Sequence, residues 1–367
     1  MKRDIERAKA YQRKKYGVAL IHLGFEVFLL SVLVLTGLTF SFRTIAGAAS
    51  PHFYVQGIVY YSLFFLYLWF FDFFFSLYSE FYLEHSYRLS NQTLSGWFVE
   101  LAKRSILSYL FSLLLILGFY FLIQKFPDRW WVWAWLGFAG VSYLLGQLFP
   151  VLIVPLFYRY SRVEDDALRN RILRLVARFN LPLENIYSLN LSKTTKKANA
   201  MFAGLGRTKR LVLADTLIQN FSAEEIESVV AHELGHFKHH DIWHHLGFNL
   251  LTSFVGFALA FELLQSLAPR FGYSGAQDLA ALPLIYLIFF LFGTLLTPSN
   301  NAYSRWRERE ADRFALKVAE PQDFIAAMEK LAELNLVDSQ PHPLVVWWFY
   351  THPPIAARIE MARRETR

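Results

Sequence analysis

Six long apolar stretches alternate with polar segments along this chain, and each is long enough to cross a lipid bilayer as a helix. A helix needs about 20 predominantly apolar residues to span about 30 Å of hydrocarbon. Charged residues are rare inside these stretches and frequent between them. We therefore predict six membrane helices, defined to within several residues at each end, near 17–40, 57–80, 104–124, 131–157, 242–266 and 279–298.

The polar segments 158–241 and 299–367 have the composition of an ordinary soluble fold. In the first of them, Ala167–Phe179 has helical spacing, whereas Ile186–Leu191 and Arg210–Leu213 are typical of strands. We expect the two segments to fold together as one α+β domain. The predicted fold class is mainly α, a polytopic α-helical membrane protein that carries this domain. The predicted division is 1–157 with about four membrane helices, 158–241, 242–298 with two further membrane helices, and 299–367.

Basic residues are concentrated ahead of the first apolar stretch. Between Met1 and Tyr16 seven basic residues stand against two acidic ones, which makes up five of the formal +7 charge of the chain. Because basic residues favour the cytoplasmic side, we predict a cytoplasmic N-terminus, and six spans return the C-terminus and both polar segments to the same side. Topology thus accounts for the basic balance, and no nucleic-acid partner is expected. The predicted outer loops contain only four basic residues, Arg43, Lys125, Arg129 and Arg270.

A cleaved signal peptide is the alternative for the first stretch, because the segment 46–50 reads AGAAS, which resembles a signal-peptidase site. The apolar run from Tyr16 to about Phe40 is too long for an ordinary signal peptide. We therefore expect a retained membrane helix.

Composition narrows the chemistry that the chain can perform. It is 54% hydrophobic, 18% aromatic and 18% charged, as a membrane protein would be, and it contains no cysteine. Disulfides, thiolate metal sites and thiol nucleophiles are excluded, so any metal must be held by His, Asp or Glu. Four polar residues inside the predicted spans are expected to face the bundle interior or water rather than lipid, namely Glu26, Asp72, Gln147 and Glu262.

The sharpest motif is His232-Glu233-Leu234-Gly235-His236. On a helix, residues four apart lie on one face, so both imidazoles can reach one tetrahedral Zn²⁺. Ser222 and Glu225 have the spacing of a capping box, and no proline interrupts the chain from there to His236, which supports a helix. Glu233 would project beside the metal, where it can take a proton from a zinc-bound water and pass it to the leaving amine.

A catalytic zinc normally has three protein ligands and an open position for water, so one ligand remains to be found. Nearby candidates are His239, His240, Asp241, His244 and His245. An imidazole one turn further along a straight helix would lie about 6 Å too far to close a tetrahedron. We interpret these histidines as interfacial or supporting residues, and we expect the third ligand to be a carboxylate from a second helix.

The segment from Asn301 to Ala315 follows the last predicted span and has helical spacing, with Arg305, Glu308 and Asp312 on one face. Glu308 could complete a His₂Glu set. Asp312, one turn on, could accept the free N–H of a ligand histidine. For Glu310 a solvent-exposed pair with a neighbouring arginine is preferred, but spacing alone does not decide between Glu308 and Glu310.

At this point the chain resembles the type-1 CAAX prenyl proteases, multi-spanning zinc endopeptidases of the gluzincin group. The resemblance runs from about Leu83 to Arg358 in several blocks that follow the order of the family. Leu89 and Ser90 depart from the family's usual aromatic-then-Asn spelling. The blocks are Glu84 to Leu94, Pro150 to Phe157, Ala198 to Phe202 with Lys209 to Leu217, Ser304 to Asp312, and Thr351-His352-Pro353-Pro354 with Arg358.

The resemblance implies a role for each matching residue. His232, His236 and Glu308 would be the zinc ligands and Glu233 the general base. His352 would contact the oxyanion or a substrate amide. Asp312 would support a ligand histidine, and Arg358 would be a neighbouring support. The segment of Asn199, Ala200 and Met201 would be an edge strand that binds the substrate backbone by β-augmentation.

The predicted function is therefore an integral-membrane zinc-dependent endopeptidase with its active site at the cytoplasmic face. By resemblance, it would cleave peptide bonds near the C-terminus of prenylated or membrane-associated substrates. Quality control of membrane proteins, as performed by heat-shock membrane metallopeptidases, is a second enzymatic alternative. A non-catalytic transporter or scaffold with a zinc-stabilised domain is a further alternative, although a structural zinc would not require Glu233. The expected partners are a peptide or protein substrate and the lipid bilayer, and the sequence does not indicate an oligomeric state.

Overall fold

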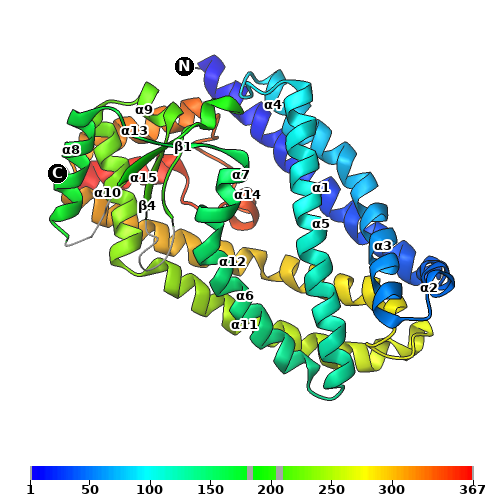
Figure 1. The fold of residues 1–367 in the computed structure, drawn as a ribbon. Helices are drawn as coiled ribbons and strands as arrows, with labels where there is room; N and C mark the ends of the chain where they lie inside the picture. The colour runs from blue at the N-terminus through cyan, green and yellow to red at the C-terminus, as the bar shows by residue number, and fades with distance from the viewer. Residues whose placement is uncertain (1, 180–184, 204–209, 366–367) are drawn as a thin grey trace.

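The computed structural model describes residues 2–179, 185–203 and 210–365. Long helices form most of it, and a small sheet with shorter helices lies at one end (Figure 1). Six helical segments have the length and composition of membrane spans, which confirms the predicted number. They are Ile5–Leu35, Phe53–Ser86, Leu94–Lys125, Trp130–Phe157, Asp241–Leu267 and Leu279–Val318.

Three of these spans consist of more than one helical element. The second is α3 (Phe53–Ser76), a π-helical turn (Leu77–Tyr82) and α4 (Leu83–Ser86). The fourth is α6 (Trp130–Leu148), a second π-helical turn (Phe149–Ile153) and α7 (Val154–Phe157). The sixth begins with a 3₁₀ turn (Leu279–Ala281) that leads into α12 (Leu282–Val318). The first span lies in α1 (Lys2–Leu35), and the third and fifth are α5 (Leu94–Lys125) and α11 (Asp241–Leu267).

A short helix that the apolar pattern did not predict follows the first span. The chain turns at Gly37, whose φ of 74° lies in the left-handed region, and continues as α2 (Leu38–Ala49). At 12 residues this helix is about 18 Å long, too short to cross a bilayer. Thr39 donates to the carbonyl of Ala280 at 2.7 Å, and Arg43 pairs with Asp278 at 2.7 Å. Helix α2 thus fastens the first span to the loop between the fifth and sixth.

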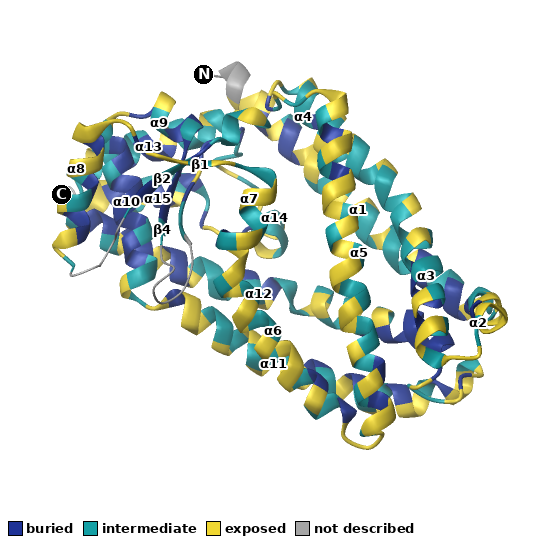
Figure 2. Cartoon of the chain, viewed as in Figure 1, coloured by how far each residue is buried: buried dark blue, intermediate teal, exposed yellow. Residues whose placement is uncertain are grey.

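The membrane helices keep apolar side chains on their outer surfaces. Figure 2 shows exposed residues along α5, α6 and α11, whereas buried residues gather in the small domain and at the opposite end of the helices. Leu114 and Leu295, for example, are 68% and 76% exposed. Such surfaces suit a hydrocarbon environment. Of the polar residues in the spans, Asp72 on α3 lies 2.8 Å from His22 Nε2 on α1.

The sheet at the other end has the strand order β1-β2-β4-β3. The strands are β1 (Tyr160–Arg162), β2 (Ile186–Leu189), β3 (Ala200–Ala203) and β4 (Arg210–Ala214). Strand β2 is parallel to β4, and the two outer pairings are antiparallel. The predicted strands at 186–191 and 210–213 correspond to β2 and β4, and the predicted helix at 167–179 corresponds to α8 (Asp166–Ala177). Strand β3 is therefore an edge strand.

One hydrophobic core joins both polar segments of the chain. It contains Leu213 of β4 and Val230 of α10 (Ala223–Lys238), together with Phe324 and Met328 of α13 (Pro321–Leu334), all buried. Helix α12 runs without interruption from the membrane region into this core, so the predicted boundary at residues 298 and 299 lies inside one helix. The remaining helices of the domain are α9 (Asp215–Asn220), α14 (Pro343–Phe349) and α15 (Ile355–Glu365).

Candidate metal centre

Helix α10 presents the two motif histidines to α12. It begins with the predicted capping box, in which the Ser222 hydroxyl accepts from Glu225 N–H and the Glu225 carboxylate accepts from Ser222 N–H. Gly235 allows α10 to approach α12 closely, because a Cβ atom at this position would lie only 2.8 Å from the Cα atom of Ala311. The small residue inside the motif thus brings His232 and His236 within reach of Glu308.

Three donor groups meet between these helices. The two Nε2 atoms of His232 and His236 are 3.1 Å apart. Glu308 Oε2 lies 3.2 Å from His232 Nε2, and Glu308 Oε1 lies 3.4 Å from His236 Nε2. Ligands at about 2.0–2.1 Å from a tetrahedral zinc are about 3.3–3.4 Å apart. These three side chains, called the donor triangle below, therefore have pairwise spacings close to those of ligands on one such ion.

Each histidine is oriented by a carboxylate on its other ring nitrogen. His232 Nδ1 lies 2.8 Å from Asp312 Oδ1, and His236 Nδ1 lies 2.7 Å from Asp241 Oδ2. When each Nδ1–H donates to its carboxylate, each Nε2 carries a lone pair. Two lone pairs facing each other at 3.1 Å cannot form a hydrogen bond, but both can bind a cation. This is the carboxylate–histidine–metal arrangement of protein metal sites.

Electrostatics also favours a cation between the three donors. Glu308 is buried, and its Oε2 atom has no hydrogen-bond partner among the residues that the structure describes. Burial lowers the pKa of His236, but its hydrogen bonds with Asp241 and Glu308 outweigh that effect and raise the pKa to about 10. The surroundings of the donors thus stabilise positive charge. Within the described parts of the chain, His232, His236 and Glu308 form the one His and carboxylate group suited to hold a metal ion.

Arginines hold both supporting carboxylates in place. Arg358 donates from Nε and Nη2 to Asp312 at 2.8 and 2.5 Å, and both side chains are buried. Arg307 donates from Nε to Asp241 at 2.7 Å. Because Arg358 donates to both oxygens of Asp312, it limits the rotation of that carboxylate. Asp312 lies beside His232, as its spacing suggested, and Arg358 lies beside Asp312, as the resemblance implied. The contacts of Asp241 with Arg307 and with His236 were not predicted.

Glu233 lies beside the donor triangle and is not part of it. Burial raises the pKa of its carboxyl group, while the neighbouring His232 and His236 lower it. A hydrogen bond with the backbone of Phe202 in β3 also lowers this pKa. The carboxylate of Glu233 is therefore close to both histidines and to strand β3.

His352 also lies beside the donors. Its Nε2 atom lies 3.2 Å from Glu308 Oε1, and its Nδ1 atom lies 2.9 Å from Thr351 Oγ1. Partial burial lowers the pKa of this imidazole, so the neutral ring is favoured. Arg305 holds the preceding chain by donating to the carbonyls of Val346 and Tyr350 at 2.9 and 2.6 Å.

The predicted substrate-binding residues lie on or beside β3, the strand at the end of the described sheet. The Asn199 carbonyl accepts from Ala214 N–H at 2.9 Å and so points toward β4. In an antiparallel pair, backbone groups alternate between the partner strand and the free side. Those of Met201 therefore also pair with β4, whereas those of Ala200 point away from the sheet. Of these three residues, Ala200 is therefore the one whose backbone N–H and C=O groups could pair with another chain.

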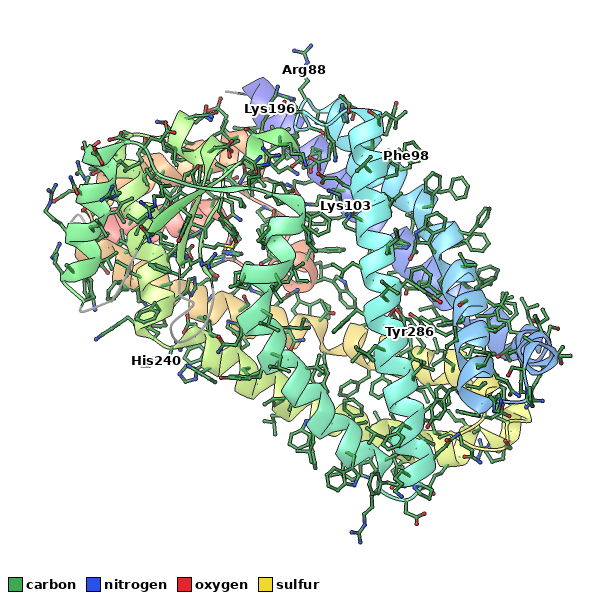
Figure 3. All side chains as sticks on the ribbon, in the orientation of Figure 1. Arg88, Phe98, Lys103, Lys196, His240 and Tyr286 are labelled. Carbon is green, nitrogen blue, oxygen red and sulfur yellow. The ribbon has the colours of Figure 1, made fainter. Side chains whose placement is uncertain are left out.

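The remaining acidic and histidine candidates lie outside the donor group. Glu310 pairs with Arg313 at 2.6 Å, as expected of an exposed helix face. His240 occupies the turn between α10 and α11, at the outer corner of the molecule (Figure 3). The rings of His239 and His245 pack edge-on against Phe314 and Tyr303.

A membrane-spanning metallopeptidase is the class of protein that this fold and donor set define. The model of peptidase family M48 matches residues 162–366, more than half of the chain, and the model of the CAAX prenyl protease N-terminal region, described as five membrane helices, matches residues 1–159. The chain belongs to peptidase family M48 and is a metalloprotease. Within residues 1–159 it has four helices of spanning length and the shorter α2.

Individual relatives agree with this assignment. The chain is 33% identical over 288 residues to the Uncharacterized metalloprotease YhfN of Bacillus subtilis, covering 76% of this chain and 67% of that protein. It is 31% identical over 304 residues to CAAX prenyl protease 1 of Saccharomyces cerevisiae, covering 77% and 67%. The crystal structure of S. mikatae Ste24p has the same fold, with a TM-score of 0.88 and 26% identity over 99% of this chain and 89% of that chain.

Proposed function

We propose that this protein is a zinc endopeptidase that cleaves prenylated or membrane-associated substrates near their C-termini. The observation that carries the proposal is the donor triangle of His232, His236 and Glu308, with Glu233 placed between it and a free edge strand. Relatives named CAAX prenyl proteases in yeast, plants and animals support a prenylated substrate.

Each residue of the site has a distinct task in this proposal. A zinc ion on the three donors would lower the pKa of a bound water toward about 7 and polarise the scissile carbonyl. Glu233 removes a proton from the attacking water and delivers it to the leaving amine. His352 donates a hydrogen bond to the carbonyl oxygen as negative charge develops there. The substrate backbone pairs with Ala200 on the free edge of β3 and is thereby directed toward the donors.

Cleavage of a lipidated peptide tests the substrate class. The full chain, purified in detergent and loaded with zinc, is incubated with a peptide carrying a farnesylated cysteine three residues from its C-terminus. The same peptide without the lipid is the control. We expect kcat/KM to be at least about tenfold higher for the farnesylated peptide, equivalent to about 1.4 kcal/mol, which burial of two CH₂ groups can supply.

Mass spectrometry of the products identifies the bond that is cleaved. Equal cleavage of both peptides would contradict lipid recognition and favour a general membrane-protein protease. Cleavage of neither peptide by zinc-loaded protein would contradict the proposed substrate class.

We also propose that the catalytic domain faces the cytoplasm. The basic N-terminal end of α1 lies on the same side of the molecule as the domain, because Gln12 donates to the carbonyl of Leu336 at 2.8 Å. Basic ends of spans favour the cytoplasmic side. Since the chain has no cysteine, single cysteines can report the topology. In intact cells an impermeant maleimide should label Gln277→Cys but not Arg169→Cys on α8, and the reverse pattern would contradict this orientation.

A further inference from the structure

The polar first turns of α1 are packed into the catalytic domain. Tyr11 is fully buried, and Ala8 and Tyr11 form a small hydrophobic cluster with Leu83, Leu89 and Leu336. Figure 1 shows this end of α1 running beside α4 and the domain. A membrane helix that only anchored the chain would not need a fully buried tyrosine outside its apolar stretch. These contacts therefore connect the first span to the domain that contains the metal centre.

A three-residue polar contact lies at the centre of this connection. Tyr11 donates its hydroxyl proton to Glu84 Oε1 at 2.5 Å. Lys197 Nζ lies 2.7 Å from Glu84 Oε2 and 3.0 Å from the Tyr11 hydroxyl. The side chains of Lys197 and Glu84 are only 28% and 16% exposed. Partial burial makes this ion pair sensitive to the loss of either partner.

Lys197 immediately precedes the chain that becomes the edge strand. Its carbonyl accepts from the Thr216 hydroxyl at 2.8 Å. The next residue, Ala198, exchanges two hydrogen bonds with the Asn335 side chain, at 3.0 and 3.2 Å. Residues 197 and 198 are thus clamped from both sides just before β3 begins.

Helix α1 reaches this clamp by two routes. Tyr11 contacts Lys197 directly and through Glu84, and Gln12 binds the carbonyl of Leu336, which adjoins Asn335. At the same end of the molecule, where Figure 3 labels Lys196 and Arg88, Lys196 N–H donates to the Leu89 carbonyl at 2.9 Å. The position of β3 therefore depends on α1 and on the chain after α4.

The same face of α1 also contacts the chain ahead of His352. Tyr16, four residues after Gln12, stacks on Phe349 with ring centroids 4.5 Å apart. Phe349 ends α14, three residues before His352. Residues 11 to 16 of α1 thus contact both the segment that leads into β3 and the segment just before His352.

We propose that residues 8–16 of α1 are a positioning element of the active site, and that the Glu84–Lys197 pair with Tyr11 sets the place of β3 for the substrate backbone. This inference rests on the proposed function of β3 in binding substrate. Pairing along a strand edge requires donors and acceptors within a few tenths of an ångström of their places. The contacts of Tyr11 and Glu84 with Lys197 fix the start of β3 to helix α1 and so supply that accuracy. None of these three residues is a proposed metal ligand.

An exchange of the two charges tests the proposal. The single variants Glu84→Lys and Lys197→Glu each place two like charges together beside Tyr11, whereas the double variant restores one positive and one negative charge. The Tyr11 hydroxyl lies within reach of both positions and can donate to a glutamate at residue 197. Glu360→Lys, which removes an exposed ion pair with Arg364 on α15, is the matched control.

For each variant, kcat, KM and bound zinc are measured with the peptide that the wild-type protein cleaves. We expect KM to rise about tenfold in each single variant, with kcat within about threefold and zinc content unchanged, because edge-strand binding is lost while the chemistry is not. The double variant should return KM to within about threefold of wild type.

Two results would overturn the positioning role. Either the single variants keep the wild-type KM, or the double variant fails to recover although it retains zinc. Both are judged against a wild-type protein that cleaves the peptide. Failure of the wild type itself to cleave would instead count against the proposed function. A destabilised fold would lower zinc content and kcat together, so it is distinguished from a rise in KM alone.

Discussion

Glu233→Gln is expected to abolish peptide cleavage while the protein keeps its metal. Glutamine has nearly the shape of glutamate but cannot accept a proton, so the attacking water loses its base. General acid–base groups contribute about 10²–10⁴-fold to rate, and kcat should fall by that factor. The donors His232, His236 and Glu308 remain in place, so zinc content should stay at the wild-type level.

The measurement is kcat with the farnesylated peptide together with zinc per chain by elemental mass spectrometry. Glu227→Gln is the matched control, since Glu227 lies on the same helix and pairs with Arg171 at 2.5 Å, away from the donors. It should leave both quantities unchanged. Turnover of Glu233→Gln near the wild-type rate would show that another group acts as base. Loss of zinc in this variant would instead identify Glu233 as a ligand.

Local patterns in the sequence were sufficient for the helix that bears the motif. The capping box of Ser222 and Glu225 predicts where α10 begins, and helical spacing then places His232 and His236 on one face. The six spans also follow from local composition, because each must cover the thickness of a bilayer. Helix α2 escaped prediction because 12 residues of mixed polarity do not meet that criterion.

Asp241 shows why the residues that support His236 could not be predicted from spacing along the sequence. His240 has a φ of 55°, so the chain turns between α10 and α11, and Asp241 lies 2.7 Å from the ring of His236. Spacing along a continuous helix would place residue 241 elsewhere. Its partner Arg307 lies 66 positions away in the sequence, on α12. Tertiary packing, which no local pattern encodes, creates this support.

The contacts of Tyr11 at the start of β3 likewise join residues that are far apart in the sequence. Tyr11 and Lys197 are 186 positions apart, and Tyr11 and Glu84 are 73 apart. In the sequence Tyr11 reads as one residue of a basic segment that orients the first span. The structure adds a second role, because the same turns of helix are packed against the catalytic domain. A segment that resembles a topology signal can therefore also position an active site.

Glu308→Ala is expected to lose both metal and activity, whereas Glu310→Ala should keep both. Spacing alone left these two glutamates unresolved, and their surroundings in the structure differ. Glu308 is buried, with its carboxylate oxygens 3.2 and 3.4 Å from the two Nε2 atoms, whereas Glu310 pairs with Arg313 on the exposed face. Removing a donor should weaken zinc binding by more than the 10–100-fold that the loss of a supporting residue costs.

Competition with a zinc-binding dye measures the affinity of each variant, and kcat/KM is measured in parallel at saturating zinc. Glu310→Ala loses only an exposed ion pair, which contributes about 0–1 kcal/mol to stability and nothing to the donor set. Wild-type affinity in Glu308→Ala would remove Glu308 from the ligand set, and zinc loss in Glu310→Ala would transfer the role to its neighbour. Glu233→Gln and Glu308→Ala together separate the roles of Glu233 and Glu308. The first change should stop turnover while zinc stays bound, and the second should remove the zinc.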